Sequence, residues 1–241
     1  LKEIFLFHLV FISTSDCSST SSCKLKERYI EGNEDVIVKS FKNLSGNALE
    51  EAVIDEILQR SKSNVEHQSR LLHVHLRHLA ITRITKNMLR NFTDILSIDL
   101  RSNLIDDIES GSFVANTKLE KIDLMGNRLV KITKHIFSSH FRELQEINLS
   151  FNAIIGIESG AFEKLVNLKS IDLSGNCIRH LHSDLFKKCE ELREVNLHNN
   201  DIIKVPYNLF NVKAHLKVLD LSHNHLNFIP DLEANSIGYY D

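Results

Sequence analysis

Acidic and amide side chains recur at a nearly constant interval along most of the chain. They are Asp99, Asp123, Asn148, Asp172, Asn196 and Asp220, spaced 24 or 25 residues apart. A row of carboxylates could support general acid–base catalysis. Because the spacing belongs to a sequence repeat, we interpret the row instead as a solvated ladder with hydrogen bonds between neighbouring strands. The chain has no nucleophile elbow, HExxH motif or phosphate-binding glycine loop, so we expect no enzyme activity and no cofactor.

Histidines and cysteines are the other side chains that could bind a metal or form covalent links. His73, His75 and His78 lie close together, but no cysteine or carboxylate stands at a spacing that would complete a metal site. We therefore predict a polar surface patch that gains charge at acidic pH, and no metal centre. Cys177 and Cys189 are expected on different sides of one repeat, too far apart for a disulfide. We place Cys189 in the core and Cys177 at the surface, where an unpaired thiol could form an intermolecular bond.

A single pattern, LxxLxLxxNxLxxLxxxxF, accounts for most of the sequence. It begins at Leu71, Ile95, Leu119, Leu144, Leu168, Leu192 and Leu216, at intervals of 24 or 25 residues. The pattern explains why the 241 residues include 33 leucines, 25 isoleucines and 21 asparagines. It resembles the leucine-rich repeat family, in the 24-residue form typical of animal extracellular proteins. The resemblance covers residues 71–232 and implies an α/β solenoid, a right-handed coil with a parallel β-sheet on its concave face and an irregular or short-helical convex side.

The positions within each repeat, numbered from its first residue, have distinct expected roles. Positions 1, 4 and 6 point inward, whereas positions 3 and 5 of the strand point to the opposite face. The asparagines at position 9 are expected to satisfy backbone groups between neighbouring coils. This predicted asparagine ladder consists of Asn103, Asn127, Asn152, Asn176, Asn200 and Asn224. The phenylalanines at position 19 are expected to stack as a spine of the core, and they are Phe113, Phe137, Phe162, Phe186 and Phe210.

The two ends of the chain do not follow the repeat. Residues 1–15, with an apolar run over 4–12, have the anatomy of a secretory signal peptide, the alternative being a buried N-terminal strand. Residues 16–70 are interpreted as an N-terminal cap with a strand at 36–38 and a helix over 47–60. Cleavage near residue 15 would leave Cys17 and Cys23 in an oxidising compartment, where we expect them to pair with each other. Residues 233–241 form a C-terminal tail without a cysteine cluster, so the tail, a partner or further chain would have to cover the last coil.

Three glycosylation sequons are present in the chain. Asn91 lies in a convex segment and Asn43 in the cap, and both are predicted to carry glycans if the protein is secreted. Asn148 occupies strand position 5, where the LNLS string is interpreted as repeat consensus without a glycan.

The concave face is the predicted binding surface of such a solenoid. Arginine, methionine and aromatic side chains are enriched in interface cores, so we predict a binding patch around Arg77, Arg101, Met125 and Phe151. Neighbouring outward residues Lys121, Glu146 and His198 are included in this patch. The alternative is that these residues are scattered over the surface and a partner uses an edge or the convex side.

Charge and resemblance together define the expected function. The net charge of −3 does not favour nucleic-acid binding, and no stretch is long enough to span a membrane. The resemblance is closest to Toll-receptor ectodomains and secreted leucine-rich immune proteins of insects. It implies a secreted, non-catalytic module that binds a protein ligand, such as another leucine-rich repeat protein or a microbial component, in innate immunity. The alternatives are a structural, adhesion or matrix protein, a truncated receptor ectodomain, or an intracellular regulator.

Overall fold

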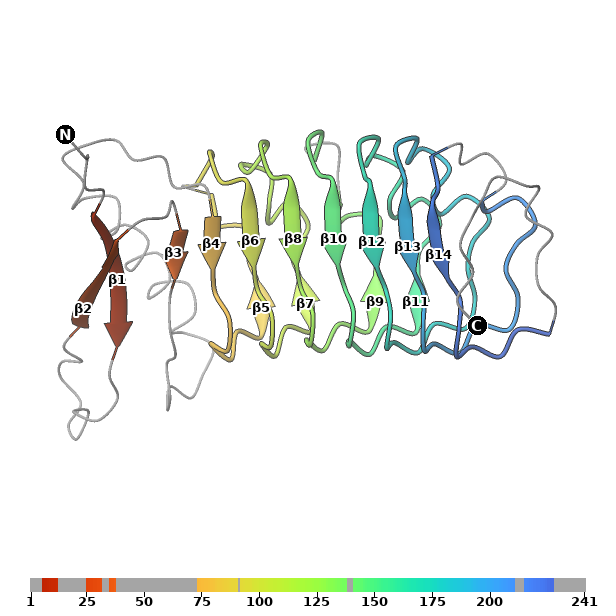
Figure 1. The fold of residues 1–241 in the computed structure, drawn as a ribbon, viewed down its shortest axis with the longest axis horizontal. Helices are drawn as coiled ribbons and strands as arrows, with labels where there is room; N and C mark the ends of the chain where they lie inside the picture. The colour runs from red at the N-terminus through yellow and green to blue at the C-terminus, as the bar shows by residue number, and fades with distance from the viewer. Residues whose placement is uncertain are drawn as a thin grey trace.

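The computed structural model describes residues 73–90, 92–137, 141–210 and 215–227, together with the backbone of three strands before them. Figure 1 shows a row of short parallel strands that follow one another along the long axis of the molecule. Several predictions lie outside the described residues: the Cys17–Cys23 disulfide, the glycans on Asn43 and Asn91, the helix over 47–60 and the tail 233–241.

Each repeat contributes one strand to an eight-stranded parallel sheet. In chain order these strands are β4 (His73–His75), β6 (Ser97–Asp99), β8 (Lys121–Asp123), β10 (Glu146–Asn148), β12 (Ser170–Asp172), β13 (Glu194–Asn196) and β14 (Val218–Asp220). The eighth strand, β3 (Asp35–Ile37), overlaps the strand predicted at 36–38 and pairs with β4. Equal repeat positions face each other across every pair, as Ile147 faces Ile171, so one repeat position forms one continuous row along the molecule.

Two further strands precede the sheet. β1 (Leu6–Ile12) pairs antiparallel with β2 (Leu25–Glu31). β1 falls within the predicted signal peptide, whose removal stays a prediction.

The sides of the coil away from the large sheet consist of turns and of two short strand pairs. β5 (Arg83–Ile84) pairs with β7 (Asp107–Ile108), and β9 (Lys131–Ile132) pairs with β11 (Gly156–Ile157). The described residues contain no helix, so the irregular convex side is observed and the short-helical one is not. Isolated turns close each coil, for example where the Phe92 amide donates to the Leu89 carbonyl (3.0 Å), and segments this short do not nucleate helices. Among these residues no helix is long and apolar enough to cross a membrane.

The core lies between the sheet and the convex turns. Position-19 phenylalanines are buried, and the rings of Phe162 and Phe186 stack with centroids 5.8 Å apart. Phe141, which follows the extra residue of the third repeat, inserts its ring between Phe113 and Phe137, with centroids 5.6 and 5.8 Å away. Cys189 is buried in this core and Cys177 is exposed, as their repeat positions indicated.

The asparagine ladder joins each coil to the preceding one. Asn176 is representative: its Oδ1 accepts from the Ile154 amide (3.0 Å), and its Nδ2 donates to the carbonyls of Leu149 (3.0 Å) and Leu173 (2.9 Å). Asn103, Asn127, Asn152, Asn200 and Asn224 make the corresponding bonds. The side chains therefore pair backbone groups that the turn after each strand would otherwise leave buried and unpaired.

A second type of buried asparagine, on the convex side, was not predicted from the sequence. Asn116 donates to the carbonyls of Leu89 (3.1 Å) and Phe92 (2.7 Å) in the preceding coil. Its repeat position holds unrelated residues elsewhere, so the pattern gave no signal for it.

Candidate binding face

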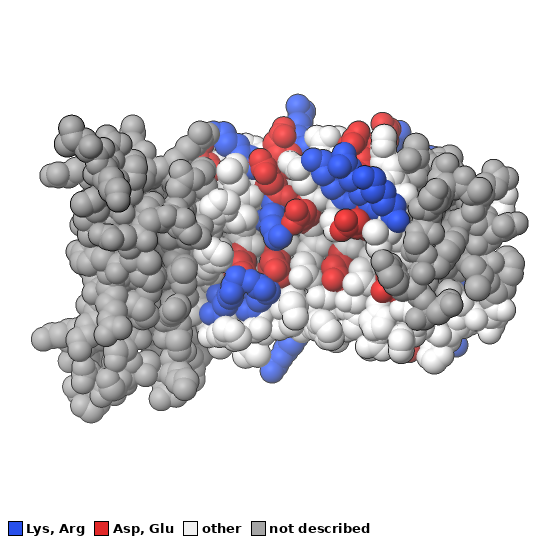
Figure 2. All heavy atoms as spheres, in the orientation of Figure 1, with Lys and Arg blue, Asp and Glu red and all other residues white. Residues whose placement is uncertain are grey.

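We call the solvent-facing side of the large sheet, with the turns that follow its strands, the sheet face. It is the side that the repeat architecture makes concave. Figure 2 shows Lys and Arg gathered near the lower ends of β6 and β8 and, in a larger group, over the upper parts of β12 and β13. The lower group lies against carboxylates at the ends of the strands, at the place where the sequence predicted a binding patch.

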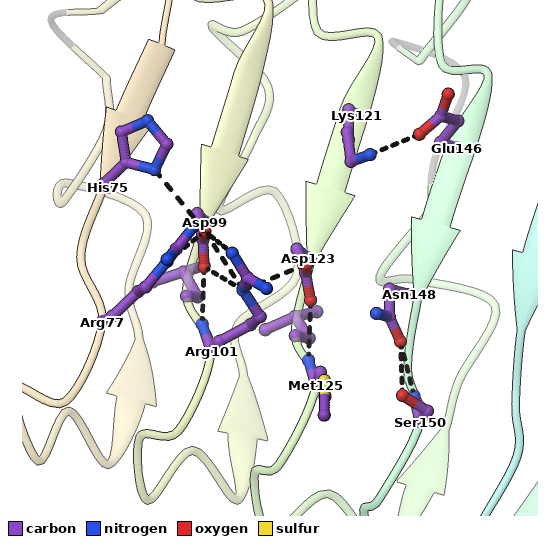
Figure 3. A network of polar contacts seen from close by, with 12 residues as sticks. His75, Arg77, Asp99, Arg101, Lys121, Asp123, Met125, Glu146, Asn148 and Ser150 are labelled. Atoms are coloured by element: carbon purple, nitrogen blue, oxygen red, sulfur yellow. Dashed lines mark hydrogen bonds and ion pairs between the residues drawn. The ribbon is translucent and has the colours of Figure 1, made fainter. Parts of the chain in front are cut away.

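Asp99 at the end of β6 is the centre of the lower group (Figure 3). Arg101 donates from Nε to Asp99 Oδ1 (3.0 Å) and from Nη2 to Oδ2 (2.7 Å), and Arg77 of the preceding coil binds the same Oδ2. His75 Nδ1 lies 3.5 Å from this oxygen, and Arg101 Nε lies 3.3 Å from Asp123 Oδ2. Two predicted patch residues, Arg77 and Arg101, are thus held together by a carboxylate between them.

The electrostatics of the two carboxylates differ. Burial alone would raise the pKa of Asp99, but hydrogen bonds from His75, Arg101 and Arg77 outweigh it and hold that pKa well below its ordinary value. The bond to Asp99 raises the pKa of the Arg101 guanidinium. Burial raises the pKa of Asp123, since its contacts with the Met125 amide and Arg101 do not offset the loss of water. The face therefore holds one firmly ionised carboxylate and one whose charge is unfavourable.

The row of position-5 residues has a local role in turn formation. In all six repeats from Asp99 onward, the side-chain oxygen accepts a hydrogen bond from the amide two residues later, as Asp172 does from Ser174 (2.8 Å). The expected bonds between neighbouring strands are largely absent from the described residues, where Asn196 to Asp172 (3.3 Å) is the one bond within the row. The row is thus a set of Asx turns that end the strands, because each carboxylate or amide reaches its own chain more readily than the next strand.

Phe151 is an exposed aromatic residue in an unusual backbone conformation. Repeat position 8 has a positive φ in every copy, and glycine occupies it at Gly126 (φ 67°) and Gly175 (φ 63°). Phe151 adopts a φ of 53° there, although bulky residues rarely do, and 57% of it is exposed. Its ring lies over Gly175 of the next coil, where a Cβ would come within 2.8 Å of the Phe151 Cδ1.

The remaining predicted patch residues bind their neighbours in adjacent coils. Lys121 pairs with Glu146 across two strands (Figure 3). His198 Nδ1 lies 2.8 Å from the Ser222 hydroxyl, and its ring contacts that of His223 edge-on at 4.7 Å. Met125 is half-buried and its amide donates to Asp123 (3.1 Å). The structure thus brings Arg77 and Arg101 together and sets Lys121–Glu146, Phe151 and His198 apart as separate contacts.

Two residues of this face, Asp99 and Gly175, were not predicted from the sequence as members of the patch. Asp99 was grouped with the other position-5 residues, although only here do arginines at position 7 of two successive repeats flank the carboxylate. Gly175 was not singled out, although a phenylalanine at position 8 between two repeats with glycine there would have indicated it.

The three predicted surface histidines do not converge on one point. His73 Nδ1 lies 2.7 Å from the Ser97 hydroxyl, His75 faces Asp99, and His78 is exposed in the following turn. Over the residues that the structure describes, no group of three or more His, Cys, Asp or Glu side chains is placed to bind a metal ion.

Comparison with known structures supports the architecture. The chain is similar to TLR13 in the crystal structure of its complex with ssRNA13, with 26% identity, a TM-score of 0.59, and coverage of 69% of this chain and 23% of that one. It is similar to a structure of the Drosophila Toll–Spatzle complex, with 24% identity, a TM-score of 0.54, and coverage of 64% and 24%. The chain thus spans about a quarter of the length of these neighbours. No curated protein matches the chain.

The repeat sequence is itself matched by family models. A model described as "Leucine rich repeat" matches residues 69–129 and 142–202, about half of the chain, and a second leucine-rich repeat model matches residues 215–235. The matched residues include every strand of the parallel sheet except β3, the whole asparagine ladder, and Phe113, Phe162 and Phe186 of the phenylalanine spine. The chain belongs to the leucine-rich repeat family.

Proposed function

We propose that this chain is a non-catalytic recognition module that binds a protein ligand through its sheet face. The observation that carries the proposal is the arginine pair on Asp99. The side chains of Arg77 and Arg101 are 42% and 34% exposed, whereas that of Asp99 beneath them is 9% exposed. A partner would therefore meet two oriented guanidinium groups, and arginine is among the residues that dominate interface energetics.

The structural neighbours supply two classes of ligand to choose between. One was solved with single-stranded RNA and the other with the protein Spatzle. The charge of this chain favours a protein ligand, because its net charge of −3 supplies no excess of cations over the whole chain. RNA binding draws its affinity mainly from cations that neutralise phosphates, which a net negative chain does not favour.

We further propose that the module acts outside the cell, in innate-immune recognition. The apolar run near the N-terminus and the sequons at Asn43 and Asn91 support secretion. Expression in insect cells tests it: N-terminal sequencing should find a mature chain starting near Asp16, and endoglycosidase treatment should lower its mass. An unprocessed, unglycosylated chain retained inside the cells would contradict secretion without affecting the proposed binding face.

The binding proposal is tested by an interaction screen followed by mutagenesis. The purified chain is screened by biolayer interferometry against secreted and cell-surface proteins of its own source organism. Each protein that binds is then measured on the Arg101→Glu/Phe151→Ala variant and on Tyr207→Ala, which truncates an exposed aromatic outside the sheet face. We expect the double variant to lose at least about tenfold in affinity and Tyr207→Ala to lose none. If a ligand bound wild type, the double variant and Tyr207→Ala with equal affinity, a role for the sheet face would be refuted.

A further inference from the structure

Phe151 occupies its position at a cost to the fold. A non-glycine residue in the left-handed region is disfavoured by roughly 1–2 kcal/mol, and the flanking repeats avoid this cost with Gly126 and Gly175. A ring that is 57% exposed recovers little of it through burial. Position 8 adopts this conformation in every repeat, and other non-glycine residues carry the same cost there, so strain alone does not single out Phe151. Its large, exposed aromatic ring makes it the candidate contact residue of this row.

The neighbouring glycine leaves room for the ring. The Phe151 ring packs on the backbone of Gly175, and any larger residue at 175 would displace it. The side chain is therefore held on one side by the protein while its other side faces solvent. A phenylalanine side chain has only two rotatable bonds, so it provides a large contact area at a small cost in conformational entropy when a partner binds it.

The arginine pair offers a second contact of defined chemistry. Arg77 binds Asp99 through Nε and Nη2, and Arg101 uses the same two nitrogens for Asp99 and Asp123. Neither Nη1 group donates to another residue in the described part of the chain. The carboxylates lie beneath and the guanidinium groups are exposed, so the atoms presented here are charged N–H donors, which suit a carboxylate acceptor.

The spacing of the two contacts matches an extended peptide. Arg101 follows β6 and Phe151 follows β10, two strands further along, which corresponds to about 10 Å. An extended chain covers this distance in about three residues. Met125 lies in the coil between them, with a flexible thioether that adapts to an intervening side chain.

Building on the proposed function, we propose that the sheet face binds an extended segment of its protein partner that crosses the strands. In this arrangement an Asp or Glu side chain binds Arg77 and Arg101, and an aromatic side chain about three residues away packs on Phe151. The partner is thus identified by a short motif, a carboxylate followed or preceded at this spacing by an aromatic residue.

A phage-displayed library of random twelve-residue peptides provides the probe. The library is selected on the immobilised full chain, and synthetic versions of the enriched peptides are measured by fluorescence anisotropy on four proteins: wild type, Phe151→Gly, Arg77→Gln and Tyr207→Ala. Phe151→Gly is compatible with the fold because two neighbouring repeats carry glycine at this position. Circular dichroism and thermal unfolding of each variant check that it is folded.

We expect the enriched peptides to share a carboxylate and an aromatic residue about three positions apart. Their affinity should fall at least about tenfold on both Phe151→Gly and Arg77→Gln and stay within twofold on Tyr207→Ala. Peptides weakened by Arg77→Gln and not by Phe151→Gly would overturn the paired motif while leaving the sheet face as a binding surface. Failure to enrich any peptide, or peptides that bind all four proteins equally, would also overturn this inference, whereas the proposed function is decided by the separate screen with folded proteins.

Discussion

At residue 151, glycine and alanine separate the effect of backbone strain from the effect of the side chain. Phe151→Gly and Phe151→Ala both remove the ring, but only glycine adopts a φ of 53° without steric cost. We therefore expect Phe151→Gly to be more stable than Phe151→Ala by about 1 kcal/mol in urea unfolding. The same pair at Tyr207, whose φ is not positive, should show the opposite order. Equal stabilities at residue 151 would mean that the left-handed conformation there carries no strain.

The two carboxylates of the sheet face should respond differently to removal of their charge. Asp99→Asn removes the negative charge that Arg77 and Arg101 share. We expect it to lower the free energy of unfolding by about 2 kcal/mol at pH 7. The pKa of Asp99 is lowered in the folded state, so the stability that it contributes is present above its ordinary pKa of 3.8 and is lost as the pH falls below that value. The difference in free energy of unfolding between wild type and Asp99→Asn should therefore become smaller as urea unfolding is repeated from pH 5 down to pH 3.

Asp123→Asn is the matched control for this experiment. The pKa of Asp123 is raised, so its charged form disfavours folding at pH 7, and asparagine can still accept the Met125 hydrogen bond. We expect this variant to be as stable as wild type or slightly more stable at pH 7, with its advantage lost on acidification. If Asp123→Asn lowered the free energy of unfolding as much as Asp99→Asn does, that would contradict the lowered pKa of Asp99 and the raised pKa of Asp123.

At the scale of the coil, the asparagine ladder should contribute more to stability than any single strand bond. Asn176→Ala leaves the Ile154 amide and the carbonyls of Leu149 and Leu173 without that partner in a buried turn. We expect it to destabilise the protein by about 3 kcal/mol in urea unfolding. Asn208→Ala, which changes an exposed asparagine outside the ladder, should stay within about 0.5 kcal/mol of wild type. Similar losses for the two variants would contradict the bridging role of position 9.

The elements were predictable from sequence to the extent that they repeat. The strands, the inward leucines and the position-9 asparagines each recur at one interval, and the parallel register follows because equal positions face each other. The convex side was harder to predict, because position 22 changes from Phe92 to Asn116 to Cys189 and no period identifies its turns. Site geometry was the least predictable, since Arg77, Arg101 and Asp99 come together through side-chain reach, which a pattern of residue types does not encode.

At the scale of the whole molecule, each coil of the repeats packs on its immediate neighbours. Leu173 is fully buried in the fifth repeat, and Leu173→Ala should cost about 3 kcal/mol through the cavity it leaves. Because a solenoid distributes its stability among nearest-neighbour interfaces, the loss should be local. Hydrogen exchange measured by mass spectrometry should show faster exchange at β10, β12 and β13 and unchanged protection at β4, with Val166→Ala, an exposed site, as the control.

If β4 lost protection as strongly as β12, the repeats would unfold as one cooperative unit, and a ligand bound near Arg77 and Phe151 would stabilise every coil equally. If the loss stays local, a ligand that spans β4 to β12 should protect those strands and leave β14 unchanged, which makes exchange a map of the face that is bound.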